Sequence, residues 1–145
     1  MDAGTGNCQT AAMRTVSDPA AMIAGMTPLP EGGDYVFCTV AEGDWPALAP
    51  LATGMFREAE GVSAILPLDV AQARGFDCTQ PMRRITLGVY SALEGVGLTA
   101  AVAGALARAG IPCNVVAAFH HDHIFVPAGM ADRALAVLRA VQAGG

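Results

Sequence analysis

The stretch RRITLGVYSALEGVGLTAAVAGALARAGIPCNVVAAFHHDHIFVP, residues 83–127, decides the fold of this 145-residue chain. Apolar residues alternate with other residues from Ile85 to Tyr90, which is the period of a half-buried strand. From Leu98 to Ala109 large apolar residues recur every four positions, as on one face of a helix. Gly110 and Pro112 then end the helix, because glycine favours the left-handed cap and proline cannot continue the helical hydrogen bonds.

The pattern continues with two strands and a second helix. Cys113–Phe119 is nearly all apolar and predicts a strand, 120–122 predicts a turn, and His123–Val126 predicts the antiparallel partner. A helix is predicted from Met130 to Val141, after Pro127. The order β-α-β-β-α is that of the ferredoxin-like βαββαβ arrangement without its last strand.

The N-terminal half repeats this order in a degenerate form. Asp18-Pro19 predicts a helix start, residues 30–34 (PEGGD) predict a turn, and Tyr35–Val40 predicts a strand equivalent to Ile85–Tyr90. Further along, the patterns predict a short helical turn at 44–51, a hairpin of 55–59 and 62–66, a helix at 69–74 ending on Gly75, and a linker at 76–82. Two related units whose edges complete each other by strand exchange are therefore expected.

Composition limits the function classes. Hydrophobic residues make up 53% of the chain, and eight arginines with no lysine stand against thirteen acids, for a net charge of -5. A chain of this charge lacks the basic surface that binds nucleic acid or anionic lipid. The apolar segment 95–119 is interrupted by Gly110 and Pro112, so it predicts no transmembrane helix.

The cysteines and the N-terminus point to the cytoplasm. No CxxC pair is formed by the four cysteines, Cys8, Cys38, Cys78 and Cys113. The sequence therefore indicates neither a zinc site nor a thioredoxin-like redox motif. The N-terminus has no signal-peptide pattern. A reducing, cytoplasmic location with free thiols is the expectation, although an even number of cysteines leaves disulfides open.

Residues 83–127 resemble an ACT domain. The likeness rests on the strand, the glycines Gly95 and Gly97 before the helix, the helix end Ala109-Gly110-Ile111, Asn114 on the next strand, and the strand 122–126 finishing in Pro127. Together with 34–40 (DYVFCTV) and 56–61 (FREAEG), the chain from about Asp18 to Val141 is similar to a family of small stand-alone bacterial proteins with tandem ACT domains. It is similar more distantly to the regulatory domains of aspartate kinase and to the arginine-sensing CASTOR proteins.

The resemblance implies an α+β fold: tandem ferredoxin-like βαββαβ ACT domains with antiparallel sheets and helices on one face. The expected organisation is a disordered extension at 1–16, a degenerate ACT unit at 17–80 and a second ACT domain at 81–145. It also implies a non-catalytic regulatory module that binds a small molecule, an amino acid above all, where two units meet. No cofactor or metal is implied, and because no catalytic domain is attached, a regulated protein would be a separate partner.

Carried over position by position, the resemblance nominates the loop after the strand, the helix start and the next strand as the ligand site. These residues are Ser91, Leu93, Glu94, Gly95, Val96, Gly97, Leu98, Thr99, Asn114 and Val116. The loop also has a physical rationale, since glycines let a ligand approach the backbone and a helix N-terminus favours a carboxylate. The alternative is that both glycines only shape the turn. Asn114 fits ligand contact and internal hydrogen bonding equally well.

Two other functions remain open at this stage. One is a structural or oligomerising module without a ligand; a homodimer is expected in any case, because strand edges and apolar surface need cover. The other is a small metal-dependent enzyme that uses His120, His121, Asp122 and His123, although no fourth ligand is evident outside that turn. The chain carries none of the common catalytic motifs, and Glu58 and Glu60 are better explained as solvated surface acids.

Overall fold

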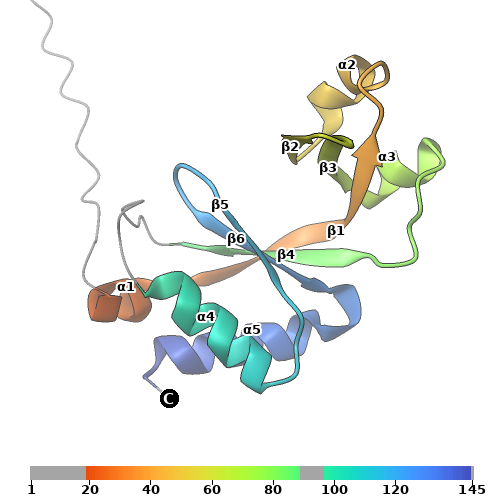
Figure 1. Cartoon of the computed structure of the whole chain (residues 1–145). Coiled ribbons are helices and arrows are strands. Elements are labelled where there is room, and N and C mark those ends of the chain that lie inside the picture. Colours follow the sequence, from red (N-terminus) through yellow and green to blue (C-terminus); the bar gives the residue numbers. More distant parts are fainter. Residues whose placement is uncertain (1–18, 89–96, 145) are drawn as a thin grey trace, which may run out of the picture.

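The computed structural model of the chain describes residues 19–88 and 97–144. Within these residues six strands form one antiparallel sheet in the order β2-β3-β1-β4-β6-β5, with helices packed against it (Figure 1). The predicted tandem ferredoxin-like fold is confirmed. None of the helices in this part of the chain is long and apolar enough to span a membrane.

The second half contains the elements that its sequence predicts. They are β4 (Met82–Leu87), α4 (Leu98–Arg108), β5 (Asn114–Ala117), β6 (Asp122–Pro127), the 3-10 turn η2 (Ala128–Met130) and α5 (Ala131–Gln142). Apart from helix ends that differ by one residue, the strand boundaries depart from the prediction. β4 begins at Met82 rather than at Ile85 and ends at Leu87, β5 is shorter than 113–119, and Asp122 belongs to β6 rather than to the turn. The Ala118 amide donates to the His121 carbonyl and closes the hairpin, so strand pairing starts at Asp122.

The first half also follows its predicted order, with one correction. Its elements are α1 (Pro19–Gly25), β1 (Pro28–Val40), α2 (Trp45–Leu48), the 3-10 turn η1 (Ala49–Leu51), β2 (Gly54–Glu58), β3 (Gly61–Pro67) and α3 (Leu68–Ala73). The turn predicted at 30–34 is wrong, because these residues lie inside β1. Gly33 has φ +82°, and the pairing of β1 with β4 shifts register between Pro30 and Asp34, so the glycines form a bulge within a continuing strand.

Each unit completes its sheet with a strand from the other. The end of β1 pairs with β3 from Tyr35 to Val40, while its beginning pairs with β4 from Pro28 to Pro30. β4 also pairs with β6 along its whole length. β1 is thus the first strand of the first unit and the last strand of the second, and β4 has the reciprocal roles. The sequence pattern of the second unit lacks a last strand, and this absence predicted the strand exchange.

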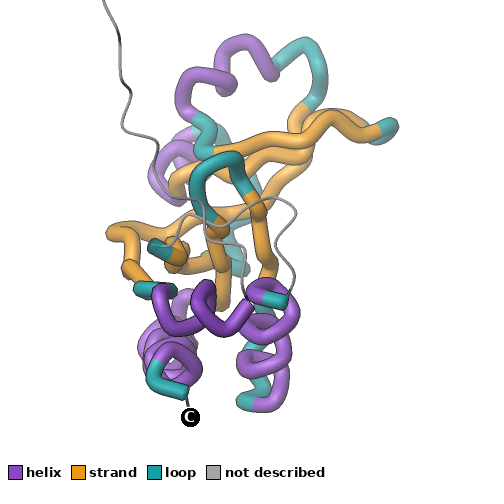
Figure 2. Tube along the Cα trace, turned by 90° about the vertical axis from the view of Figure 1, so that its left-hand side faces the viewer, coloured by secondary structure: helices purple, strands orange, loops and turns teal. Residues whose placement is uncertain are grey.

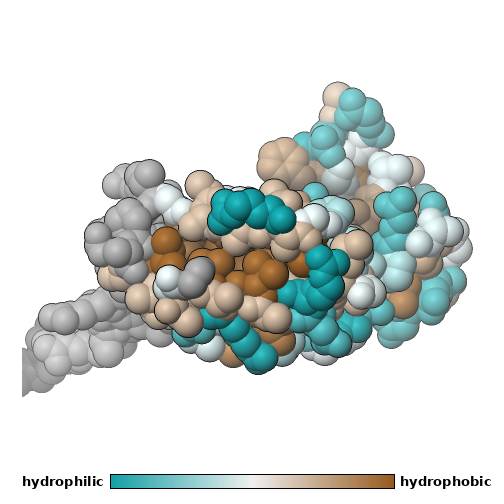
Figure 3. Space-filling view, turned by 90° about the horizontal axis from the view of Figure 1, so that it is seen from below, coloured by the Kyte–Doolittle hydropathy of each residue, from teal (hydrophilic) through white to brown (hydrophobic). Residues whose placement is uncertain are grey.

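Two hydrophobic cores lie between the sheet and its helices. The core of the second unit contains Met26, Ile85, Leu87, Leu98, Val102, Leu106, Ile111, Ile124, Val126, Ala131, Ala134 and Leu138. The core of the first unit contains Val36, Val40, Trp45, Leu48, Val62, Ala64, Leu66 and Ala71. The helices of the two units therefore gather at opposite ends of the molecule, with the twisted sheet between them (Figure 2). Seen from the α4 and α5 end, apolar side chains gather in the middle of the surface and hydrophilic ones surround them (Figure 3).

On the other face of the sheet, the helix-free face, no helix of residues 19–88 and 97–144 packs, but side chains of the strands partly cover it. Residues directly opposite each other on neighbouring strands share a face, which places Tyr35, Ile65 and Phe125 together on the helix-free face. All three are at most 8% exposed and form a third apolar cluster. The Phe125 ring meets the rings of Tyr35 and Phe37 edge-on, with centroids 5.8 and 5.2 Å apart. These side chains therefore bury one another on the helix-free face.

Candidate functional site

The start of α4 is the part of the predicted ligand site that the structure describes best. Gly97 is the N-terminal cap residue, with φ +107° in the left-handed region, and its carbonyl accepts the first helical hydrogen bond, from Ala101. Within the described residues no side chain caps this end of the helix. The first amide N–H groups of a helix have no partner inside the helix, so they are available to an anion. Leu98 is only 2% exposed and fills the core, whereas Thr99 is exposed.

The remaining loop candidates lie outside the described residues. They are Ser91, Leu93, Glu94, Gly95 and Val96.

Asn114 and Val116 lie on a different face of the sheet from α4. Asn114 is opposite Phe125, and Val116 is opposite His123, so both face the helix-free side. Asn114 is also level with Arg84 near the start of β4, while the chain leaves β4 for α4 after Leu87, about 10 Å further along at ~3.3 Å per residue. The predicted site is therefore divided: Gly97, Leu98 and Thr99 stay together, and the two β5 residues line separate hollows.

A polar network crosses three strands on the helix-free face, and the sequence analysis missed it. The Thr86 hydroxyl donates to a Glu31 carboxylate oxygen at 2.9 Å, and the His123 Nδ1 lies 3.1 Å from the same hydroxyl. Because the hydroxyl proton goes to Glu31, the His123 Nδ1–H is the donor in the second bond. Thr86 is only 6% exposed, although it alternates along β4 with the core residues Ile85 and Leu87. The concave face buries it, and a single-sequence pattern carries no signal of that curvature.

Arg84 borders this network. Its guanidinium stacks over the Tyr35 ring at 5.2 Å from the centroid, and Nη2 lies 3.9 Å from a Glu31 oxygen. Its Nε is buried and makes no hydrogen bond to any described residue. Two adjacent arginines at the start of an apolar strand are the sequence feature that could have indicated this polar region. The other one, Arg83, also contacts β1, through an ion pair with Asp34 at 2.7 Å.

Burial sets the charge states around the network. Burial is the main cause that lowers the pKa of His123, and the Arg84 and His121 charges lower it further, against smaller opposing effects of Glu31 and Asp122. Burial also raises the pKa of Asp122, although the His123 and His121 charges act the other way. The lowered pKa favours the neutral form of His123, which agrees with a single Nδ1–H that donates to Thr86.

The histidine turn does not assemble a metal site. Within residues 19–88 and 97–144, no three side chains of His, Cys, Asp or Glu come together in a way that could hold a metal ion. His123 instead points its ring at Thr86. Cys38, Cys78 and Cys113 are free and partly buried, and burial raises the pKa of Cys38 and Cys113. In Cys38 the charge of Cys78 adds to that effect.

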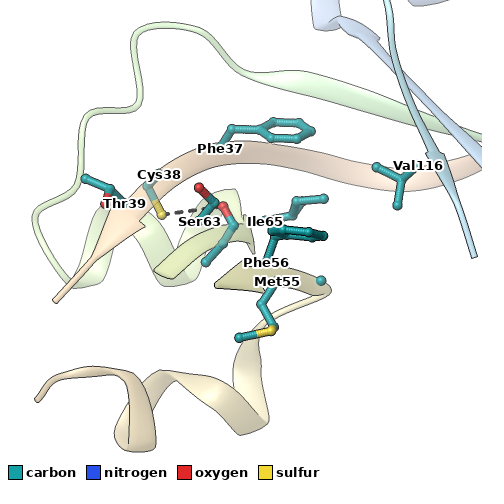
Figure 4. A pocket seen from close by; sticks show the side chains of 10 residues that line it. Phe37, Cys38, Thr39, Met55, Phe56, Ser63, Ile65 and Val116 are labelled. Carbon is teal, nitrogen blue, oxygen red and sulfur yellow. Dashed lines mark hydrogen bonds between the residues drawn. The ribbon is translucent and has the colours of Figure 1, made fainter. Parts of the chain in front are cut away.

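An apolar hollow lies on the helix-free face and joins the two units. Its volume is about 450 Å³, and it is lined by Phe37, Cys38, Thr39, Gly54, Met55, Phe56, Ser63, Ala64, Ile65 and Val116. The side chains of Phe37, Phe56 and Ile65 project from the first unit toward Val116 of β5 (Figure 4). Asn114 lines a neighbouring hollow of about 400 Å³ with Gln80, Met82, Pro112, Pro127 and, again, Phe37. The sequence analysis missed the larger hollow except for Val116.

Known structures share this architecture. A protein of unknown function from Vibrio cholerae, described as a possible transport protein, is 40% identical, with a TM-score of 0.75 over 85% of this chain and 94% of its own. A protein from Agobacterium tumefaciens is 17% identical, with a TM-score of 0.62 over 81% of this chain and 89% of its own. The regulatory subunit of aspartate kinase from Thermus flavus is 12% identical, with a TM-score of 0.55 over 81% and 96%. The last two show the fold alone. No curated protein sequence matches the chain significantly.

Two family models match side by side. An ACT-domain model matches residues 16–83, and a second ACT-domain model matches residues 81–140. ACT domains are generally regulatory modules that bind ligands rather than catalytic domains. The matches divide the chain where β4, the strand that both units use, begins. The chain belongs to the ACT-domain family and carries two ACT domains in tandem.

Proposed function

We propose that the protein is a non-catalytic regulatory module that binds an amino acid or another small carboxylate at the start of α4. The observation that carries the proposal is the helix N-terminus that opens on Gly97 in the left-handed conformation, without a capping side chain among the described residues. Three amide N–H groups in the first turn can hold a carboxylate, and the helix dipole adds to the attraction. The proposed contacts are residues 91 and 93–99, with Asn114 and Val116 left to the hollows on the other face.

The strand exchange connects this site to the first unit through β4. The loop that leads to α4 leaves the end of β4, and β4 is also the last strand of the first unit. A ligand held at the start of α4 would therefore stabilise a strand on which both units depend. We propose that a separate protein partner in the cytoplasm reads the change, which agrees with the free thiols Cys38, Cys78 and Cys113.

A thermal-shift screen against the twenty amino acids tests this function. A ligand present at 100 times its dissociation constant raises the free energy of unfolding by about 2.7 kcal/mol. At least one α-amino acid is expected to raise the melting temperature, while the corresponding amine without the carboxylate leaves it unchanged. Equal stabilisation by acid and amine would contradict a carboxylate site.

We also propose that the protein forms a homodimer. β2 and β5 are the two edges of the sheet and present unpaired backbone groups, which a second copy can satisfy by extending the sheet. Such pairing leaves the helix-free face open. Light scattering at micromolar concentration should give twice the chain mass of 14.7 kDa. A mass equal to one chain would refute the dimer, and a dimer without any ligand response would favour the alternative of a purely structural module.

A further inference from the structure

The hollow on the helix-free face is unusual because large apolar side chains stand around it without being buried. Phe56 is 72% exposed and Phe37 is 44% exposed. Single exposed apolar residues are common on protein surfaces, but a group of them around one concavity marks a binding surface. The carboxylate site proposed above leaves these residues without a role.

The floor of the hollow exists because of one glycine. Gly54 of β2 lies opposite Ile65 of β3, which lies opposite Phe37 of β1, so the three residues form one row across the sheet. Both other members of the row have large side chains, and Gly54 leaves the end of the row empty. A Cβ at Gly54 would meet only the Ile65 Cδ1, at an ordinary 3.4 Å. The backbone conformation at this position does not require glycine. The hollow does require it, because a larger side chain would fill the space.

Size and chemistry together define the occupant. A volume of about 450 Å³ falls in the ~300–1,000 Å³ range of small-molecule pockets. None of the ten lining residues carries a charge, and the polar groups are limited to the Thr39 and Ser63 hydroxyls and the Cys38 thiol. The Ser63 hydroxyl is already bonded to Glu58, which leaves an acid rather than a base beside the hollow. An anion gains nothing in such a site, whereas an aromatic or branched hydrocarbon body gains apolar contact.

We infer that this hollow is a second ligand site, for an uncharged small molecule with an aromatic or branched apolar body. Its walls come from both units, since Phe37, Phe56 and Ile65 belong to the first and Val116 to the second (Figure 4). An occupant therefore bridges the two ACT units on the face opposite the helices. The site is distinct from the carboxylate site at α4 in position and in chemistry.

Indole is a suitable probe because it is aromatic, uncharged and lacks the carboxylate that the α4 site needs. We expect titration with indole, followed by NMR of the methyl groups, to shift the Ile65 and Val116 signals in a saturable manner. Gly54→Leu fills the floor and should weaken indole binding by about tenfold or more. Phe56→Ser removes one exposed wall without touching the core and should weaken it by about threefold or more. Gly43→Leu is the matched control, because a Cβ at Gly43 meets nothing within 4 Å, and should keep the wild-type affinity.

The outcomes separate this site from the proposed function and from a second copy of the chain. Gly97→Val should leave indole binding unchanged, so failure of the amino-acid site does not affect the result. Indole shifts that are scattered over the surface, or that persist in both Gly54→Leu and Phe56→Ser, overturn the inference. Shifts of the Ile65 and Val116 methyls with protein concentration alone also overturn it, because they would assign the hollow to an interface between copies.

Discussion

Thr86 holds three strands together through one hydroxyl group. It donates to Glu31 of β1 and accepts from His123 of β6, while its own backbone belongs to β4. The network thus fixes the exchanged strand β1 to the body of the second unit. Because Thr86 is buried, leaving its hydroxyl unpaired would cost about 1–3 kcal/mol. The polar residues on this face therefore help to hold the exchanged strand in place.

At this scale we predict a specific pH dependence of stability. Burial lowers the pKa of His123 in the folded protein, so the unfolded chain binds the proton more readily. The contribution of His123 is complete above the unfolded-state pKa of about 6.5 and is lost as the pH falls through the lower folded pKa. In urea unfolding experiments, the free energy of unfolding should decrease as the pH is lowered from 7.5 to 5. In His123→Gln, which keeps a donor but does not titrate, this fall should be smaller. Identical pH profiles would contradict the role of His123.

A close approach of the two backbones at Gly88 holds the beginning of β1 in register with the end of β4. The Gly88 amide donates to the Thr27 carbonyl at 2.7 Å, just where β1 begins beside the end of β4. A Cβ at Gly88 would lie 3.0 Å from that carbonyl oxygen and 3.3 Å from the Leu29 Cδ1. Any side chain there pushes the exchanged part of β1 away from β4.

Gly88→Ala should therefore lower the free energy of unfolding by about 1–3 kcal/mol, the usual cost of overpacking. Gly129→Ala is the matched control, since a Cβ at Gly129 meets nothing within 4 Å. Chemical denaturation of both variants measures the difference. Equal stabilities would mean that the start of β1 is not pressed against β4.

Local patterns predicted the elements well and their curvature poorly. Turn residues and periodicity located α4 and α5, because caps and four-residue spacing are encoded within a few positions of each helix. The PEGGD segment at 30–34 has the local composition of a turn but lies within β1, and the residue that pairs with Asp34 there, Arg83, lies 49 residues away along the chain. The partners of Thr86, Glu31 and His123, likewise lie 55 and 37 residues away along the chain. The glycines before α4 were enough to predict the part of the candidate site at the start of that helix. The hollow at Gly54 depends on contacts between strands, which no local sequence pattern encodes.

At the scale of the whole molecule, sharing of β1 and β4 joins two ACT units into one folding body. Neither unit has a complete sheet without the other, and the Tyr35, Ile65 and Phe125 cluster spans both. Each unit alone would expose an unpaired strand edge and lose part of its core. The units are therefore expected to unfold together.

Unfolding should consequently show one transition by both far-UV circular dichroism and Trp45 fluorescence. Trp45 reports on the core of the first unit only, whereas circular dichroism reports on all helices, including α4 and α5 of the second unit. Coincident midpoints are the expected result. Two separate transitions would show that the exchanged strands do not couple the units.

The central claim is that an amino acid binds at the start of α4, and isothermal titration calorimetry tests it most directly. At least one of the twenty amino acids should give saturable heat with wild type, and Gly97→Val should abolish that heat, because a β-branched residue strains the left-handed backbone that presents the amides. Gly110→Val is the matched control: it places the same strain at φ +71° at the other end of α4 and should keep the binding. Heat with no amino acid, or heat that survives Gly97→Val, would contradict the claim.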